Sequence, residues 1–240
     1  MLYLGPERPQ VQDWAQRFAT LAQQAEDPRL RRFYAAGAVA ADTPLAEVAL
    51  LALDFETTGF SPRRDGIVSI GLVPFNLRRI RLAGAEHWVV RPRVDLTGTS
   101  VVVHGITHTE VARAPDLDQH LGALLQALAG RVVVVHHRGI ERGFLDAALR
   151  RRLGEGIEFP VIDTLELEAR VHRRRSPSLW DRLRGRQPLS IRLADSRARY
   201  HLPHYRPHHA LTDALATAEL LQAQVADRFG PATPVSELWC

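Results

Sequence analysis

The sequence predicts an α/β fold in which a mixed β-sheet is covered by helices. Two kinds of segment carry this prediction. Short and almost wholly apolar runs at residues 48–53 and Val132–Val135 are typical of strands buried on both faces. Longer segments at residues 116–129 and 210–229 repeat apolar side chains at the three-to-four spacing of amphipathic helices. A predicted hairpin among the strands favours a mixed sheet over an all-parallel one.

The N-terminal part of the chain reads as a helical extension over residues 1–46. Trp14, Phe18 and Leu21 fall at helical spacing, and Pro28 opens a second helical segment. Asp42, Thr43 and Pro44 then form a break. We expect the main domain over residues 47–230, followed by a C-terminal tail at residues 231–240.

The main domain continues with a hairpin of two strands at Ile67–Phe75 and residues 79–90. Gly130 ends the helix at residues 116–129, and another helix follows the strand Val132–Val135. A short strand at residues 159–162 precedes a helix that begins near Thr164. Residues 174–207 are rich in Arg, Pro and Ser, with one short helix near residues 189–199.

Composition limits the classes of protein that this chain can be. No run reaches the roughly 18–20 apolar residues of a membrane-spanning helix, so we expect a cytoplasmic protein without membrane contact. The only cysteine, Cys240, excludes a disulfide within the chain and a cysteine-rich zinc site.

All 31 basic residues of the 240-residue chain are arginine, and the net charge is +4. Clustered arginines suit phosphate oxygens, although arginines on helix surfaces are usually only solvated. The clusters are Arg150 to Arg152, Arg173 to Arg175, and Arg182, Arg184 and Arg186.

Two carboxylates at the end of the first apolar strand point to a metal site. Alternate side chains of a strand share a face, so Asp54 and Glu56 project together. Adjacent carboxylates repel each other, and hard divalent cations such as Mg²⁺ or Mn²⁺ relieve that repulsion. The competing interpretation is a solvated strand end.

Two further segments add acidic and imidazole groups. Glu141 is expected near the start of the helix that follows Val132–Val135, where helix dipoles alone also favour an acidic residue. His208 precedes Asp213 by five positions at the start of the last helix. Asp213 can face the strand carboxylates, and a histidine of near-neutral pKa suits removal of a proton from water.

Taken together, Asp54-x-Glu56-Thr57-Thr58-Gly59, Glu141 and His208-x4-Asp213 resemble the three motifs of the DEDDh (DnaQ-like) 3′→5′ exonucleases. This family includes the proofreading epsilon subunit of bacterial DNA polymerase III. The similarity covers about residues 48–228 and includes His104-Gly105-Ile106-Thr107, where the family often has a Gly-Ile-Thr turn. It implies an RNase H-like fold, an exonuclease domain at residues 47–230 and hydrolysis of phosphodiester bonds with two divalent cations, Mg²⁺ or Mn²⁺.

The resemblance also implies roles for single residues. Asp54 would bridge the two metals, Glu56 and Asp213 would complete the first metal site, and Glu141 would support the second. His208 would be the general base. Thr57, Thr58, Phe60 and His137 would contact the substrate, Phe60 against the last base.

The second motif departs from the family pattern. The family usually has His-Asn with an aspartate four positions after the asparagine, whereas this chain has His136, His137 and Glu141. The longer side chain of Glu141 puts full activity and metal preference in question.

The expected substrate is single-stranded DNA or a frayed 3′ end, with release of nucleoside 5′-monophosphates. One alternative is an RNA-trimming exoribonuclease of the same fold. Another is a non-catalytic nucleic-acid-binding module. A polymerase proofreading subunit is a further alternative, which the short segment after the last helix does not favour.

Overall fold

The structure is a computed structural model that describes residues 13–94, 106–172 and 189–240. Within these ranges a five-stranded sheet has the strand order β3-β2-β1-β4-β5. The strands are β1 (Leu50–Thr57), β2 (Ile67–Phe75), β3 (Glu86–Val89), β4 (Val132–Val135) and β5 (Val161–Asp163). β1 pairs antiparallel with β2 and parallel with β4, so the sheet is mixed. The predicted fold class is confirmed.

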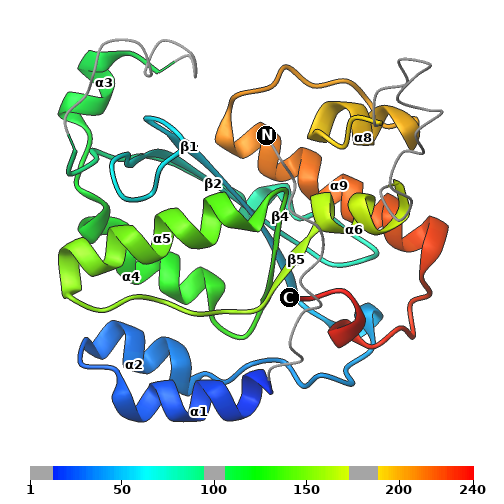
Figure 1. The fold of residues 1–240 in the computed structure, drawn as a ribbon, viewed down its shortest axis with the longest axis horizontal. Helices are drawn as coiled ribbons and strands as arrows, with labels where there is room; N and C mark the ends of the chain where they lie inside the picture. The colour runs from blue at the N-terminus through cyan, green and yellow to red at the C-terminus, as the bar shows by residue number, and fades with distance from the viewer. Residues whose placement is uncertain (1–12, 95–105, 173–188) are drawn as a thin grey trace, which may run out of the picture.

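Helices cover both faces of this sheet (Figure 1). They are α1 (Trp14–Gln24), α2 (Pro28–Ala35), α3 (His108–Arg113), α4 (Leu117–Leu128), α5 (Arg138–Leu153), α6 (Thr164–His172), α8 (Leu193–Arg199) and α9 (Ala210–Arg228). Figure 1 shows α4 and α5 on one side of the sheet and α6 and α9 on the other. This arrangement buries β1 and β4 on both faces, as their apolar sequences require.

The strand β1 extends further than the apolar run at residues 48–53 indicates. β2 pairs with it from Leu50 to Thr57, which keeps both carboxylates inside the strand. β4 pairs only with Leu50, Leu51 and Ala52. Asp54 and Glu56 therefore lie beyond the point where β4 ends, on a part of β1 that has a paired strand on one side only.

The predicted second strand of the hairpin, residues 79–90, is wrong in its first half. Only Glu86–Val89 forms β3. The side chain of Asn76 accepts hydrogen bonds from the backbone N–H groups of Arg78 and Arg79, and a 3-10 turn follows at Leu82–Gly84. Ile80 keeps one isolated bridge to Phe75, and the 3-10 turn then interrupts the strand ladder before β3. The short strand predicted at residues 159–162 likewise lies later, at Val161–Asp163.

The N-terminal helices and the C-terminal residues share the core of the main domain. Trp14, Phe18 and Phe33 belong to the same buried cluster as β1 and β4, and so do Leu238 and Trp239. Asp13 caps α1 and Asp27 caps α2, where Pro28 occupies the first helical turn.

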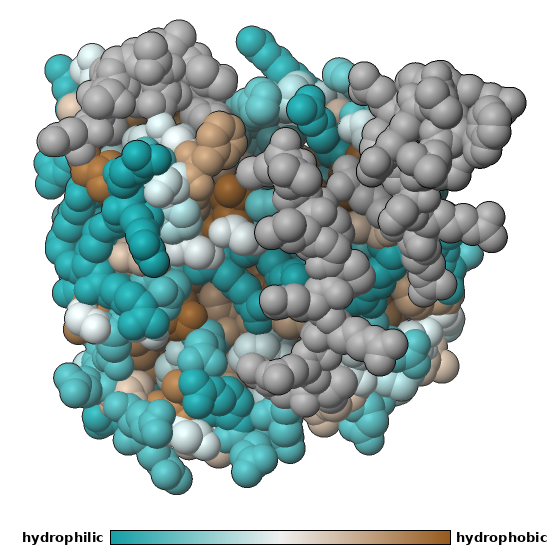
Figure 2. Space-filling view, in the orientation of Figure 1, coloured by the Kyte–Doolittle hydropathy of each residue, from teal (hydrophilic) through white to brown (hydrophobic). Residues whose placement is uncertain are grey.

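The surface seen in Figure 2 is mainly hydrophilic over the described residues, with smaller hydrophobic areas between. None of the described helices is both long and apolar enough to cross a membrane.

Candidate active site

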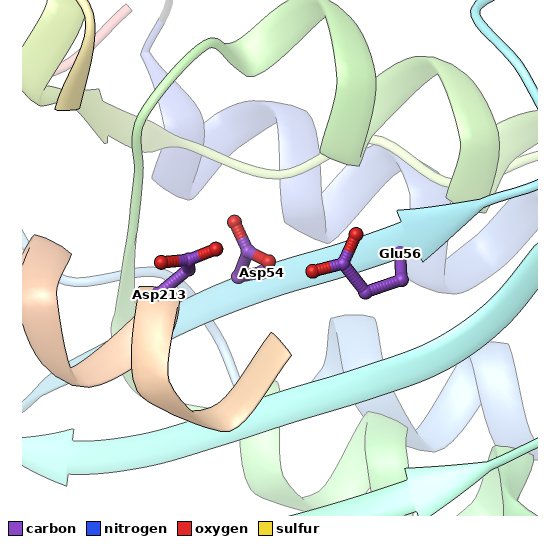
Figure 3. Close-up of side chains that lie close together, drawn as sticks. All are labelled: Asp54, Glu56 and Asp213. Atoms are coloured by element: carbon purple, nitrogen blue, oxygen red, sulfur yellow. The ribbon is translucent and has the colours of Figure 1, made fainter. Parts of the chain in front are cut away.

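Three carboxylates meet on the face of the sheet that α9 covers. Asp54 and Glu56 project from β1, and Asp213 comes from the first turn of α9 (Figure 3). One oxygen atom of each lies within 4.8 Å of those of the other two. The geometry thus brings together two predicted residues of one strand and a third residue that is 157 positions after Glu56 in the chain.

The approach of α9 to the sheet depends on Gly71 of β2. Gly71 pairs with Asp54, and a Cβ atom built on Gly71 would lie only 2.2 Å from the carbonyl oxygen of Ala210. The first turn of α9 therefore touches the strand backbone at the one position without a side chain. This close packing places Asp213 beside β1.

The carboxylates share a poorly solvated environment. Burial raises the pKa of Asp54 well above its usual range, and the charges of Glu141, Asp213 and Glu56 raise it further. Burial also raises the pKa of Asp213, although a hydrogen bond from the backbone of His208 opposes this effect. Close negative charges of this kind are stabilised by cations. Carboxylate oxygens are the ligands that Mg²⁺ and Mn²⁺ prefer.

Glu141 reaches the same region from α5. It is 3% exposed, and its Oε2 atom is buried without a hydrogen-bond partner. Burial raises its pKa, as does the charge of Asp163. A buried oxygen without a donor fits a position for a cation. Glu141 lies close enough to raise the pKa of Asp54 but is not one of the three residues that converge within 4.8 Å.

His208 precedes α9 on an exposed loop. Its φ of 69° lies in the left-handed region, and its backbone N–H donates to Asp213 Oδ2 at 2.8 Å. The exposed imidazole borders a cleft of about 770 Å³ together with Asp213. The backbone of the predicted general base is thereby fixed to a predicted metal ligand.

Thr57 and Thr58 form the turn that follows β1. The hydroxyl of Thr57 donates to the carbonyl of Gly59 at 2.6 Å, and the hydroxyl of Thr58 accepts from the N–H of Gly66 at 3.0 Å. Each hydroxyl keeps the capacity for two further hydrogen bonds. The predicted substrate contacts of the two threonines thus remain a prediction, and their observed role is to shape the turn.

Phe60 stands out from this turn with 82% of its surface exposed. The loop that carries it is held by Arg151, whose guanidinium donates to the carbonyl groups of Pro62, Arg63 and Asp65. Phe60 forms part of the cleft that His208 and Asp213 border, and α8 lines the opposite part with Leu193 and Ala198. An exposed aromatic ring on a tethered loop beside an apolar cleft suits stacking on a planar ligand.

The second motif holds α5 in place. His137 precedes the helix with a φ of 114°, its backbone N–H donates to Asp163 at 3.0 Å, and its Nδ1 atom is buried without a partner. His136 is half-buried and lies between the hydroxyl of Thr164 and the carbonyl of Ile191. Burial lowers its pKa to about 4. His136 is therefore a neutral structural residue near pH 7.

Sequence reasoning missed Asp163. Its carboxylate accepts hydrogen bonds from the N–H groups at the starts of both α5 and α6, including those of Arg138 and Leu165. An acidic residue at the end of the apolar run Val161–Asp163 was the signal that could have identified it. Asp163 ties the helix that carries Glu141 to β5.

The arginine cluster at residues 150–152 makes contacts within the chain. Arg150 pairs with Asp146, Arg152 pairs with Asp116, and Arg151 holds the loop of Phe60. The clusters at residues 173–175 and 182–186 lie outside the described residues, as do His104 and Gly105. Thr107 of the expected turn caps α3.

Comparisons with known proteins show the family and the fold of this chain. The sequence model of the RNase T family, described as exonuclease, matches residues 51–221. A DNA polymerase III PolC-type protein of Thermotoga maritima is 27% identical over 179 residues, which are 75% of this chain and 12% of that protein. A DNA polymerase III subunit epsilon-like protein of Rhodobacter capsulatus is 33% identical over 75% of this chain and 24% of its own length. The chain thus spans a small part of these relatives.

Solved nuclease structures share the fold. The nuclease domain of 3′hExo, a DEDDh family member bound to rAMP, aligns with a TM-score of 0.59 and 18% identity over 75% of this chain and 92% of its own. Exonuclease X in complex with 5′ overhanging duplex DNA aligns with a TM-score of 0.53 and 21% identity over 79% and 98%.

Proposed function

The chain belongs to the RNase T exonuclease family with a DnaQ-like, RNase H-like fold, and we propose that it removes nucleotides one at a time from 3′ ends of nucleic acid. Single-stranded DNA is the proposed substrate and nucleoside 5′-monophosphates are the products. The observation that carries this proposal is the convergence of Asp54, Glu56 and Asp213 within 4.8 Å, with buried Glu141 acting on Asp54.

The carboxylates would hold two divalent cations, Mg²⁺ or Mn²⁺. Asp54, Glu56 and Asp213 offer oxygen atoms for the first, and Glu141 with Asp54 offers them for the second. When bound, such cations activate water and stabilise the charge on phosphate and leaving oxygens. The raised pKa values of Asp54 and Asp213 and the partnerless Oε2 atom of Glu141 support this assignment.

His208 would act as the general base. It takes a proton from water as the water oxygen bonds to phosphorus and the bond from phosphorus to the 3′ oxygen breaks. The leaving 3′ oxygen takes up a proton from solvent, so the shortened strand ends in a 3′-hydroxyl group, and the released nucleotide keeps the phosphate. The bond from the His208 backbone to Asp213 supports a fixed place for the base beside the carboxylates.

Phe60 and the apolar cleft would receive the bases of the substrate. The exposed ring of Phe60 offers a stacking surface that accepts any base, which suits an enzyme without sequence preference. Thr57, Thr58 and His137 are the further proposed substrate contacts.

The experiment is degradation of a 5′-labelled single-stranded oligonucleotide. With Mg²⁺ or Mn²⁺ we expect a ladder that shortens from the 3′ end, abolished by EDTA and by Asp54→Asn. A phosphorylated 3′ end and a circular strand are the controls. Immediate release of labelled mononucleotide would contradict the polarity, and cutting of the circle would contradict exonuclease action.

The same assay separates the alternatives. Faster degradation of the matching RNA oligonucleotide would support an RNA-trimming enzyme. Binding without cleavage in either metal would support a non-catalytic module. Similarity to polymerase III proteins also suggests association with a polymerase, which co-purification with a polymerase subunit would test.

A further inference from the structure

The loop of residues 201–209 follows Tyr200, the C-cap of α8, and carries His208 next to the N-cap of α9. Its N-terminal part is held by backbone bonds from His201 to Ala198 and from Leu202 to Arg197. Its C-terminal end is held by the bond from His208 to Asp213. Pro203 and Pro207 have no N–H to donate. The middle of the loop therefore depends on side chains for its position.

Arg197 of α8 makes one such contact to the loop and two contacts to α9. Its guanidinium donates to the carbonyl of Pro203 at 2.8 Å, to the carbonyl of Ala216 at 2.6 Å and to Glu219 Oε2 at 2.7 Å. The side chain is 4% exposed, which matches the value for a core residue. Arg197 thus joins α8, the loop and α9 with one planar, multidentate group.

Tyr205 completes the arrangement from the loop. The guanidinium carbon of Arg197 lies 4.6 Å from the centre of the Tyr205 ring, and the Tyr205 hydroxyl donates to Glu219 Oε1 at 2.9 Å. The two oxygen atoms of Glu219 are therefore shared between Arg197 and Tyr205. We call these three residues the Arg197–Tyr205–Glu219 cluster.

The cluster adjoins the candidate active site. Arg197 and Tyr205 line the same cleft as His208 and Asp213, and Ala216, whose carbonyl Arg197 binds, lies one turn after Asp213 on α9. Arg197 and Tyr205 hold the loop at a set distance from α9. They therefore also set the position of the backbone that leads into His208. An error of about 1 Å in the position of a reacting group lowers rates by about 100-fold.

We propose that the Arg197–Tyr205–Glu219 cluster is a positioning device that holds His208 beside Asp213 for proton transfer. The proposal rests on the proposed function, in which His208 is the general base. The polar groups of these three residues bind one another, the loop and α9. They act through the loop, so changing them should lower kcat. This loss should appear only when the His208 imidazole is present.

The test is a double-mutant cycle between Tyr205→Phe and His208→Ala, measured by single-turnover degradation of the single-stranded oligonucleotide. Tyr205→Phe keeps the ring and removes only the hydroxyl. We expect it to lower kcat about three- to tenfold, with KM unchanged. In the His208→Ala background it should have no further effect.

Tyr200→Phe is the matched control. Its hydroxyl donates to Glu168 at 2.9 Å at the end of α8, and its removal should leave kcat within about twofold of wild type. Arg197→Gln should lower kcat by about 100-fold. If that variant does not fold, the Tyr205→Phe cycle decides the question.

Equal losses from Tyr205→Phe in both backgrounds, or no loss in either, would overturn the positioning role. A wild-type protein that degrades no oligonucleotide would overturn the proposed function and this inference together. An active wild type with impaired His208→Ala and unaffected cluster variants would overturn this inference alone.

Discussion

Gly71→Ala tests the contact that brings α9 to the sheet. The added Cβ would lie 2.2 Å from the carbonyl oxygen and 2.3 Å from the carbonyl carbon of Ala210, and 2.5 Å from the nitrogen of Leu211. Both sides of this contact are backbone, so no side chain can turn away. Restoring an ordinary separation of about 3.5 Å requires a displacement of at least about 1 Å.

The displaced turn carries Asp213 and follows His208 directly. A shift of about 1 Å should lower kcat by about 100-fold, because the carboxylate leaves β1. Overpacking at this position should also lower the free energy of unfolding by about 1–3 kcal/mol. Single-turnover degradation and urea unfolding measure the two effects.

Gly122→Ala is the control because Gly122 lies in α4 with no atom within 4 Å of an added Cβ. It should raise the free energy of unfolding by about 1 kcal/mol and leave kcat unchanged. A Gly71→Ala protein with kcat within about twofold of wild type would refute the close-packing argument, whatever its stability.

Four further changes probe the rest of the site. The raised pKa of Asp54 means that, without metal, its contribution to stability is present below the ordinary carboxyl pKa and is lost as pH rises through the raised value. In EDTA at pH 8, the free energy of unfolding of Asp54→Asn, measured with urea, should therefore exceed that of wild type by about 1–3 kcal/mol. An unchanged free energy of unfolding would contradict repulsion among the carboxylates. His208→Ala should lower kcat by about 10²–10⁴-fold. Mn²⁺ should still raise the Tm of this variant, and loss of that increase would show that His208 is a metal ligand. Phe60→Ala should raise KM for single-stranded DNA and change the free energy of unfolding by less than about 0.5 kcal/mol. An unchanged KM would exclude contact between Phe60 and a base of the substrate. Asp163→Ala should lower the free energy of unfolding in urea by about 2 kcal/mol, because two helix starts lose their acceptor, and no loss would show that water replaces it.

The sequence by itself determined the strand and the helix that carry the site, β1 and α9, and the placement of functional residues within each. The apolar run before Asp54 predicts a buried strand, and the twofold periodicity of a strand places Asp54 and Glu56 on one face. The helical spacing after Ala210 predicts α9 and puts Asp213 in its first turn. These are local properties, set by the geometry of a strand or a helix over a few residues.

The tertiary structure alone decided how these elements meet. No local pattern shows that Gly71 is the point where α9 touches β2, or that Asp163 joins the starts of α5 and α6. The same holds for Arg151 and Arg197, which look like surface arginines in the sequence but bind backbone carbonyls of other elements, at Pro62 and Ala216. Such contacts join residues far apart in the chain, and their energies depend on burial and on distance in space, which neither spacing nor composition records.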